Sequence, residues 1–132
     1  MSESTSAVRA DGTARRRGEG HRVLFCFGVL QPFYDANDAT TKAVKDALLG
    51  AYDDLHGRFG VDVLGTIDDD ELMVGPTPEW PWLCYILADV PTIDTAIALC
   101  NLIRETRIGE DRLWRYIRIE ARVGRRLFFG NA

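Results

Sequence analysis

Two short segments are apolar at almost every position, and they limit what this chain can fold into more than any other feature. They are RVLFCFGVL at 22–30 and WLCYILADV at 82–90. Each is far shorter than the roughly 20 residues of a transmembrane helix. Each has the length of a strand with apolar side chains on both faces. Such strands lie in the centre of a sheet, so both faces of the sheet need an apolar cover.

Two further segments alternate between apolar and polar residues, as strands with one buried face do. VDVLGTID places Val61, Val63 and Ile67 on one side, with Leu64 as an exception. YIRIEARV at 116–123 alternates over its whole length. The pattern predicts that both segments are edge strands.

Two helices are predicted between these strands. The first begins after Asn37, a suitable N-cap, and runs to about Phe59. Its apolar stripe is Val44, Ala47, Leu48, Ala51, Tyr52, Leu55 and Phe59. The second opens at Pro91 and runs to about Glu105. Its expected inner stripe is Ile93, Ala96, Ile97, Cys100 and Ile103.

The resulting order, β-α-β-β-α-β, predicts an α+β fold of the ferredoxin-like type. We expect residues 21–132 to form one domain, a four-stranded antiparallel sheet with two helices on one face. Residues 1–20 are poor in large apolar groups and are predicted to be a disordered tail. The helix-free face of the central strands also needs an apolar cover. A second copy of the chain would supply it, which predicts a homodimeric α+β barrel.

Composition excludes several functions. The net charge of −4 argues against nucleic acid or an anionic membrane as a partner. The three cysteines lie in apolar runs without CxxC spacing, which predicts free thiols in a reducing compartment. An arginine run at 15–17 precedes the apolar VLFCFGVL like an export signal, but polar residues interrupt it and no cleavage site follows. Cytoplasmic localisation is therefore expected.

Common cofactor and catalytic motifs do not occur either. The chain has no glycine-rich phosphate loop, no GxSxG elbow and no HExxH pair. We therefore expect no nucleotide-type cofactor and no metal.

A polar row on the last predicted strand is the first candidate for chemistry. Tyr116, Arg118, Glu120 and Arg122 share one face of it. They are either edge-strand charges that discourage aggregation, with possible ion pairs across a dimer, or the lining of a cavity. In a cavity, Arg118 would fix an anionic or carbonyl oxygen, and Glu120 would move a proton or orient Arg118.

An aromatic group at the start of the third predicted strand is the second candidate. In EWPWLCY, Trp80, Trp82 and Tyr85 either plug the end of the barrel or form a flat wall for a planar aromatic ligand. Trp114 and Tyr116 would approach this wall from the start of the last strand.

Two weaker candidates complete the set. His56 is the one plausible imidazole base, although capping or surface placement is the commoner role for such a residue. The acidic run at 68–71 lacks the spacing of a calcium loop, so a solvated turn is favoured over a cation held by Asp68 and Asp70.

The pattern as a whole resembles the dimeric α+β barrel superfamily over residues 22–123. That superfamily includes antibiotic-biosynthesis monooxygenases, muconolactone isomerases and small polyketide cyclases. TIDDDELMVGPTPEWPWLCYILADVP and CNLIRETRIGEDRLWRYIRIEARVGR also resemble IacB-type proteins of bacterial indole-acetate degradation. The resemblance implies a small aromatic metabolite as ligand, without metal or flavin.

Three functions therefore compete. The first is a small enzyme of aromatic metabolism that isomerises, opens or cyclises a ring, or oxygenates it without a cofactor. Arg118, Glu120, Tyr116 or His56 would then act in catalysis, and Trp80, Trp82, Tyr85 and Trp114 would bind the substrate. The second is a non-catalytic metabolite-binding protein, and the third is a purely structural dimer.

Overall fold

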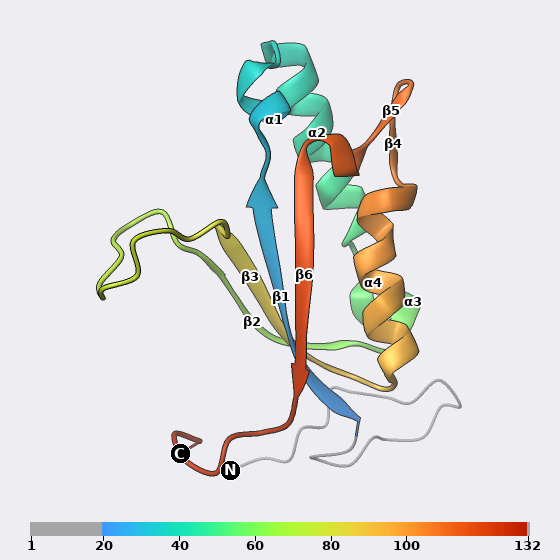
Figure 1. Ribbon diagram of the computed structural model, residues 1–132. Coiled ribbons are helices and arrows are strands. Elements are labelled where there is room, and N and C mark those ends of the chain that lie inside the picture. The colour runs from blue at the N-terminus through green and yellow to red at the C-terminus, as the bar shows by residue number, and fades with distance from the viewer. Residues whose placement is uncertain (1–19, 132) are drawn as a thin grey trace.

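The structure is a computed structural model that describes residues 20–131 (Figure 1). Its strands are β1 (His21–Val29), β2 (Asp62–Asp68), β3 (Cys84–Val90), β4 (Arg107–Ile108), β5 (Asp111–Arg112) and β6 (Ile117–Gly124). Its helices are α1 (Gln31–Asp35), α2 (Asp38–Ala51), α3 (Leu55–Phe59), α4 (Ile93–Glu105) and the 3-10 turn η1 (Leu113–Arg115). Apart from Gly20, the predicted tail lies outside the described residues.

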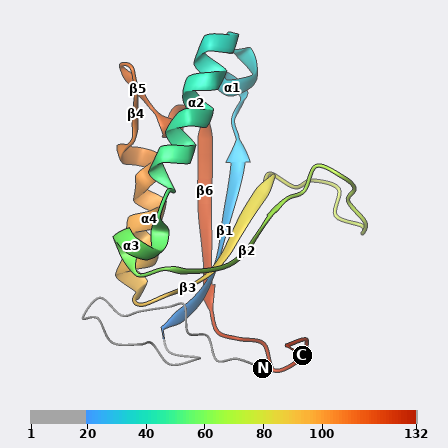
Figure 2. The same cartoon turned by 180° about the vertical axis from the view of Figure 1, so that it is seen from behind.

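The main sheet has four strands in the order β2-β3-β1-β6, and all neighbouring strands are antiparallel. The two strands that are apolar on both faces, β1 and β3, are central, as their sequences predicted. Helices α2, α3 and α4 lie on one face of this sheet (Figures 1 and 2). The protein therefore belongs to the α+β class.

The hydrophobic core lies between the helices and the sheet. Val23, Phe25 and Phe27 of β1 are buried in one cluster with residues of α2, α3 and α4. Leu99 and Ile103 of α4 are almost fully buried there. The alternate residues of β1, among them Leu24 and Cys26, consequently point to the opposite face, which we call the open face.

The first predicted helix is divided in two. Helix α2 ends at Ala51, and Asp54 adopts a left-handed conformation with φ of 45° before α3 begins. The Asp54 side chain then accepts a hydrogen bond of 3.1 Å from the Gly57 amide, which caps α3. The predicted stripe is nevertheless correct, because all seven of its residues are buried in the core or packed against it.

The predicted faces of the second strand are wrong beyond Leu64. The register of β2 against β3 shifts between Val63 and Gly65, so Leu64 occupies a bulge. A bulge adds one residue and reverses which face the later side chains occupy. Ile67 therefore pairs with Tyr85 on the open face instead of sharing the side of Val63.

Other elements depart from the expected pattern too. The inner face of α4 is centred on Leu99, whereas Ile93 and Ile97 are about half exposed. Helix α1 and the β4–β5 hairpin occur where the sequence predicted only turns. Within residues 20–131, no helix is long and apolar enough to span a membrane.

Candidate functional site

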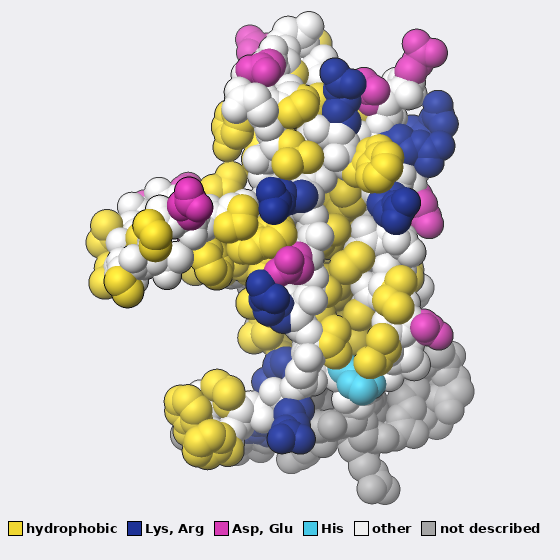
Figure 3. Space-filling view, in the orientation of Figure 1, with side chains coloured by type: hydrophobic (Ala, Val, Ile, Leu, Met, Phe, Trp, Pro, Cys, Tyr) yellow, Lys and Arg dark blue, Asp and Glu magenta, His cyan; other side chains and the backbone are white. Residues whose placement is uncertain are grey.

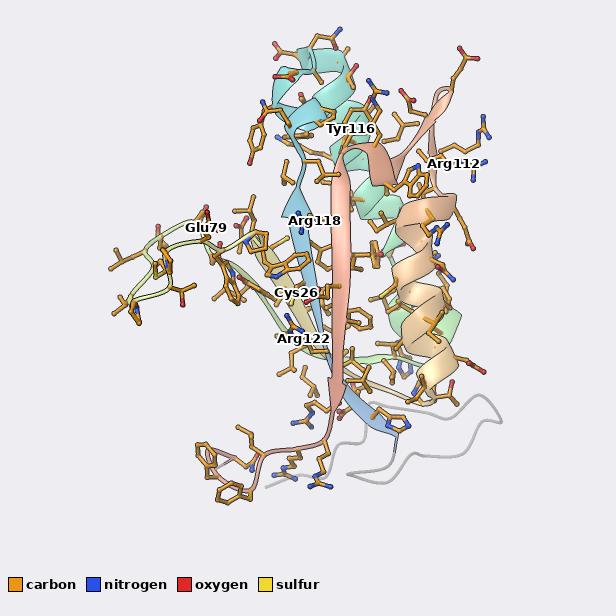
Figure 4. The ribbon with its side chains drawn as sticks, viewed as in Figure 1. Cys26, Glu79, Arg112, Tyr116, Arg118 and Arg122 are labelled. Carbon is orange, nitrogen blue, oxygen red and sulfur yellow. The ribbon has the colours of Figure 1, made fainter. Side chains whose placement is uncertain are left out.

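A row of side chains crosses the open face at its centre. Ile67, Tyr85, Cys26 and Glu120 are successive cross-strand partners on β2, β3, β1 and β6. Figure 4 shows Cys26 between Arg118 and Arg122 along the sheet. Burial raises the pKa of the Cys26 thiol; nearby Arg122 opposes this shift and Glu120 adds to it. Cys26 is therefore protonated at neutral pH and is a poor nucleophile.

Arg118 lies above this row and stacks on an aromatic ring. Its guanidinium carbon is 5.1 Å from the centre of the Trp82 ring, within the range of a cation–π contact. Gly28 makes the approach possible, because a Cβ at that position would collide with the Pro81 carbonyl oxygen and the Arg118 side chain. The predicted pairing of arginine with the aromatic wall is thus present for Trp82.

Glu120 and Arg122 form a close ion pair on the same face. Arg122 Nη2 lies 2.5 Å from Glu120 Oε2. Glu120 Oε2 is itself buried, and Arg122 is its ion-pair partner. Glu120 is therefore neutralised by Arg122 rather than by Arg118.

The other two predicted wall residues, Trp80 just before β3 and Tyr85 on β3, are separated from Arg118 by β1. Trp80 donates a hydrogen bond to the Tyr85 hydroxyl, which donates one of 2.7 Å to Asp69 Oδ2. Partial burial and the bond to Asp69 raise the pKa of Tyr85. The three residues thus form a short chain at the base of the β2–β3 connection. Trp82 is buried, whereas Trp80 is half exposed.

Three predicted site residues lie elsewhere. Tyr116 precedes β6, is buried in the core cluster and places its hydroxyl 3.5 Å from Asp111 Oδ2. Trp114 stacks with Arg104 of α4, whose guanidinium carbon lies 5.3 Å from the centre of the Trp114 ring. His56 is exposed on α3, on the helical side of the sheet. The expectation that Trp114 and Tyr116 approach the Trp82–Tyr85 wall is therefore wrong, because η1 turns the chain before β6 starts.

The acidic run at 68–71 forms no cation site in the described part of the chain. No three His, Cys, Asp or Glu side chains there lie close enough together to hold a metal ion. Asp69 is already the acceptor for Tyr85.

A pocket of about 470 Å³ lies on the helical side of the sheet. Its lining residues come mainly from α2, the end of β2, the start of β3 and the end of β1. Its lining is almost entirely apolar and includes Phe27, Leu48, Leu49, Tyr52, Cys84, Ile86 and Ile117. Lys45, Thr66 and Asp68 are its polar members. Gly28 and Tyr85 also line it, so it adjoins the open-face row.

The buried ionisable groups of this pocket are neutral at physiological pH. Burial raises the pKa of both the Tyr52 phenol and the Cys84 thiol. Tyr52 also donates its hydroxyl proton to the Leu99 carbonyl oxygen at 2.6 Å, so that group is already used. Lys45 and Asp68 are the only charged residues of the lining, and both are exposed. The pocket therefore suits a ligand with an apolar body and one polar end.

Sequence reasoning missed this pocket. Leu48 and Tyr52 were identified only as members of the core stripe of the first helix. Nothing in the sequence marked Lys45 as a pocket residue, because a single lysine on a helix is normally solvated. The pocket arises because β2 and β3 diverge from α2, and no local pattern encodes that divergence.

Comparison with known proteins adds no further constraint, since no family model, curated protein or solved structure matches the chain. The structure is that of an α+β protein with a four-stranded antiparallel sheet and helices on one face. Its resemblance to the dimeric α+β barrels stays a prediction.

Proposed function

We propose that the protein binds a small planar, largely apolar metabolite in the pocket between α2 and the sheet. The supporting observation is the pocket itself, with about 470 Å³ of space and an almost wholly apolar lining. Well-formed apolar cavities with a few polar groups are the usual ligand sites of small proteins. An aromatic acid fits this description, with its ring against Phe27, Tyr52 and Ile86 and its carboxylate near Lys45.

We also propose that two copies join through their open faces in a ferredoxin-like dimeric barrel. The strand order β2-β3-β1-β6 and the helix-free face support this arrangement. Ile67 of β2 and Leu87 of the central strand β3 are each more than a third exposed there. Apolar residues on a sheet face are normally covered, and a second copy is the commonest cover.

A second candidate is catalysis at the open face. Its support is the Arg118–Trp82 stack beside the Glu120 carboxylate, which is ion-paired with Arg122. An aromatic acid held by Arg118 would place an acidic proton near this carboxylate, as isomerisation or ring opening requires. Within the pocket, by contrast, Tyr52 and Cys84 are protonated donors rather than bases. The pocket therefore favours binding, and the open face is where acid–base chemistry would lie.

One experiment separates these candidates. Purified protein is mixed with a panel of indole and phenolic carboxylic acids and with their uncharged analogues, and retained ligands are detected by native mass spectrometry. For each retained ligand, affinity is measured for wild type, Thr66→Trp and Val63→Trp. Thr66 is exposed and lines the pocket, so a tryptophan there fills it; Val63 is a similarly exposed residue of β2 outside the lining.

We expect Thr66→Trp to weaken binding at least about tenfold, because it occupies the volume that the ligand needs. Val63→Trp should bind as wild type does. Unchanged binding in Thr66→Trp, with loss in Arg118→Ala, would move the ligand to the open face. Turnover that is lost in Glu120→Gln would then establish catalysis there. Failure of every compound to bind would contradict the proposal for this ligand class.

A further inference from the structure

The connection between β2 and β3 carries apolar and acidic residues away from the body of its own subunit. We call residues 69–83 the arm; Figure 1 shows it projecting beyond the sheet. Leu72, Met73 and Val74 on the arm are 79%, 61% and 86% exposed, and none belongs to the core cluster. Three consecutive exposed apolar residues on a projecting segment are typical of a contact surface. The arm also carries four carboxylates, at Asp69, Asp70, Glu71 and Glu79.

The opposite edge of the sheet carries the complementary charge. Strand β6 presents Arg118 and Arg122 on the open face, and Arg125 and Arg126 follow directly after it. Arg118 is an exposed residue that stacks on Trp82 but forms no ion pair with another described residue. After β6, Leu127, Phe128 and Phe129 are also exposed. Figure 3 shows the arm and this C-terminal segment projecting on the same side, with a hollow between them.

We propose that the arm of one copy lies over the β6 edge of a second copy, and that the partner's arm completes the open-face site. The inference rests on the proposed dimer and specifies its arrangement: β2 of each subunit faces β6 of the other. Two-fold symmetry repeats the contact, so each subunit gives one acidic arm and accepts one on its arginine edge. The opposite arrangement, arm against arm, would bring like charges together.

This arrangement has a consequence for Arg118. A carboxylate from the partner's arm supplies the ion pair that Arg118 lacks within its own subunit. The arm's exposed apolar residues cover the partner's Leu24 and Leu87 positions, which flank Cys26 on the open face. In an isolated subunit the site is therefore open and Arg118 is unpaired. In the dimer the site is enclosed.

Charge reversal tests the arrangement. The arm variant is Asp70→Lys with Glu71→Lys, and the edge variant is Arg118→Glu with Arg122→Glu. A matched control, Glu105→Lys with Glu110→Lys, makes the same charge change as the arm variant beside α4, away from the open face. Dimer dissociation constants are measured by sedimentation velocity for each variant and for an equimolar mixture of the arm and edge variants. Circular dichroism checks that each variant is folded.

We expect each of the arm and edge variants to dissociate at least about tenfold more readily than wild type, since each brings like charges together twice per dimer. The equimolar mixture should recover tight association as a heterodimer, because both contacts then have opposite charges. Recovery also shows that the weaker association of the edge variant is not caused by loss of the Glu120–Arg122 pair within its own subunit. The control should associate as wild type does.

The outcomes distinguish this inference from the proposed function. A wild-type protein that dimerises, while charge reversal leaves its dissociation constant unchanged, would overturn the arm arrangement and leave the dimer standing. A wild-type monomer would overturn both. Neither result bears on the pocket beside α2, which Thr66→Trp tests separately.

Discussion

Tyr52 connects three parts of the molecule. Its hydroxyl donates to the Leu99 carbonyl oxygen of α4, and its ring meets Phe27 of β1 edge-on, with centroids 5.2 Å apart. It also lines the pocket beside α2. An aromatic residue with one apolar face and one satisfied hydroxyl can serve the core and the pocket together.

Replacing Tyr52 with phenylalanine should lower the free energy of unfolding by about 1 kcal/mol, because a half-buried hydrogen bond is lost. Burial raises the pKa of Tyr52 in the folded protein, so the unfolded chain releases its proton first as pH rises. Wild-type stability is thus fully present below the ordinary tyrosine pKa of about 10 and declines above it.

The difference between wild type and Tyr52→Phe should therefore shrink at strongly alkaline pH. Urea unfolding at neutral and alkaline pH measures it. Tyr34→Phe is the control, since Tyr34 is 61% exposed and makes no hydrogen bond among the described residues. Equal stabilities for the two variants at neutral pH would contradict the role given to Tyr52.

At the scale of elements, the packing of the end of the arm against β1 depends on the missing side chain of Gly28. The Leu83 amide donates to the Phe27 carbonyl oxygen at 2.7 Å, which fixes the end of the arm against β1. Just before it, the Pro81 carbonyl occupies the space where a Cβ of residue 28 would lie. The position of Trp82 over Arg118 follows from this contact.

Gly28→Ala should destabilise the protein by roughly 1–3 kcal/mol, because backbone has to move to admit the methyl group. It should also change the fluorescence of the tryptophans as Trp82 shifts. Gly65→Ala is the matched control, since Gly65 also lies in the sheet and has open space around its Cβ position. Chemical denaturation of both variants measures the difference, and a Gly28→Ala protein as stable as Gly65→Ala would refute the contact.

At the scale of the whole molecule, one face of the sheet carries the core and the other lacks an equivalent cover. The open face, the arm and the C-terminal segment together account for most of the large apolar side chains that stand more than half exposed. The proposed dimer would cover these exposed apolar side chains.

The melting temperature should therefore rise with protein concentration, because association stabilises only the folded chain. Differential scanning fluorimetry over a wide dilution series measures the shift. High salt should reduce the concentration dependence, since exposed charge pairs are screened. A melting temperature independent of concentration would argue that the subunit is stable alone.

The sequence predicted the class and the order of the main elements for a clear reason. Apolar periodicity reports which faces are buried, so β1, β3, β6 and the stripe of α2 and α3 were identified in their correct places. The same reasoning failed at Leu64 and Asp54. The bulge at Leu64 adds one residue and reverses the faces of the rest of β2. The left-handed residue Asp54 divides the predicted helix in two but leaves its apolar stripe facing the core.

For the candidate site, the sequence selected Arg118 and Trp82, and the fold brings them together. It also selected Trp114 and Tyr116, which η1 turns away from the open face, and His56, which lies on α3 on the other side of the sheet. Glu120 was paired in expectation with Arg118, whereas its close partner is Arg122. The residue types indicated which side chains could bind or move a proton. Which of them lie next to one another depends on the strand register, which the sequence did not reveal.

By itself, the sequence determined the α+β class and the central position of β1 and β3, since both follow from local patterns of burial. Only the tertiary structure decided the pocket beside α2, the stacking of Arg118 on Trp82 and the projection of the arm. Those features depend on how elements distant in the chain diverge or cross, and that geometry is fixed by packing among many residues rather than by any one segment.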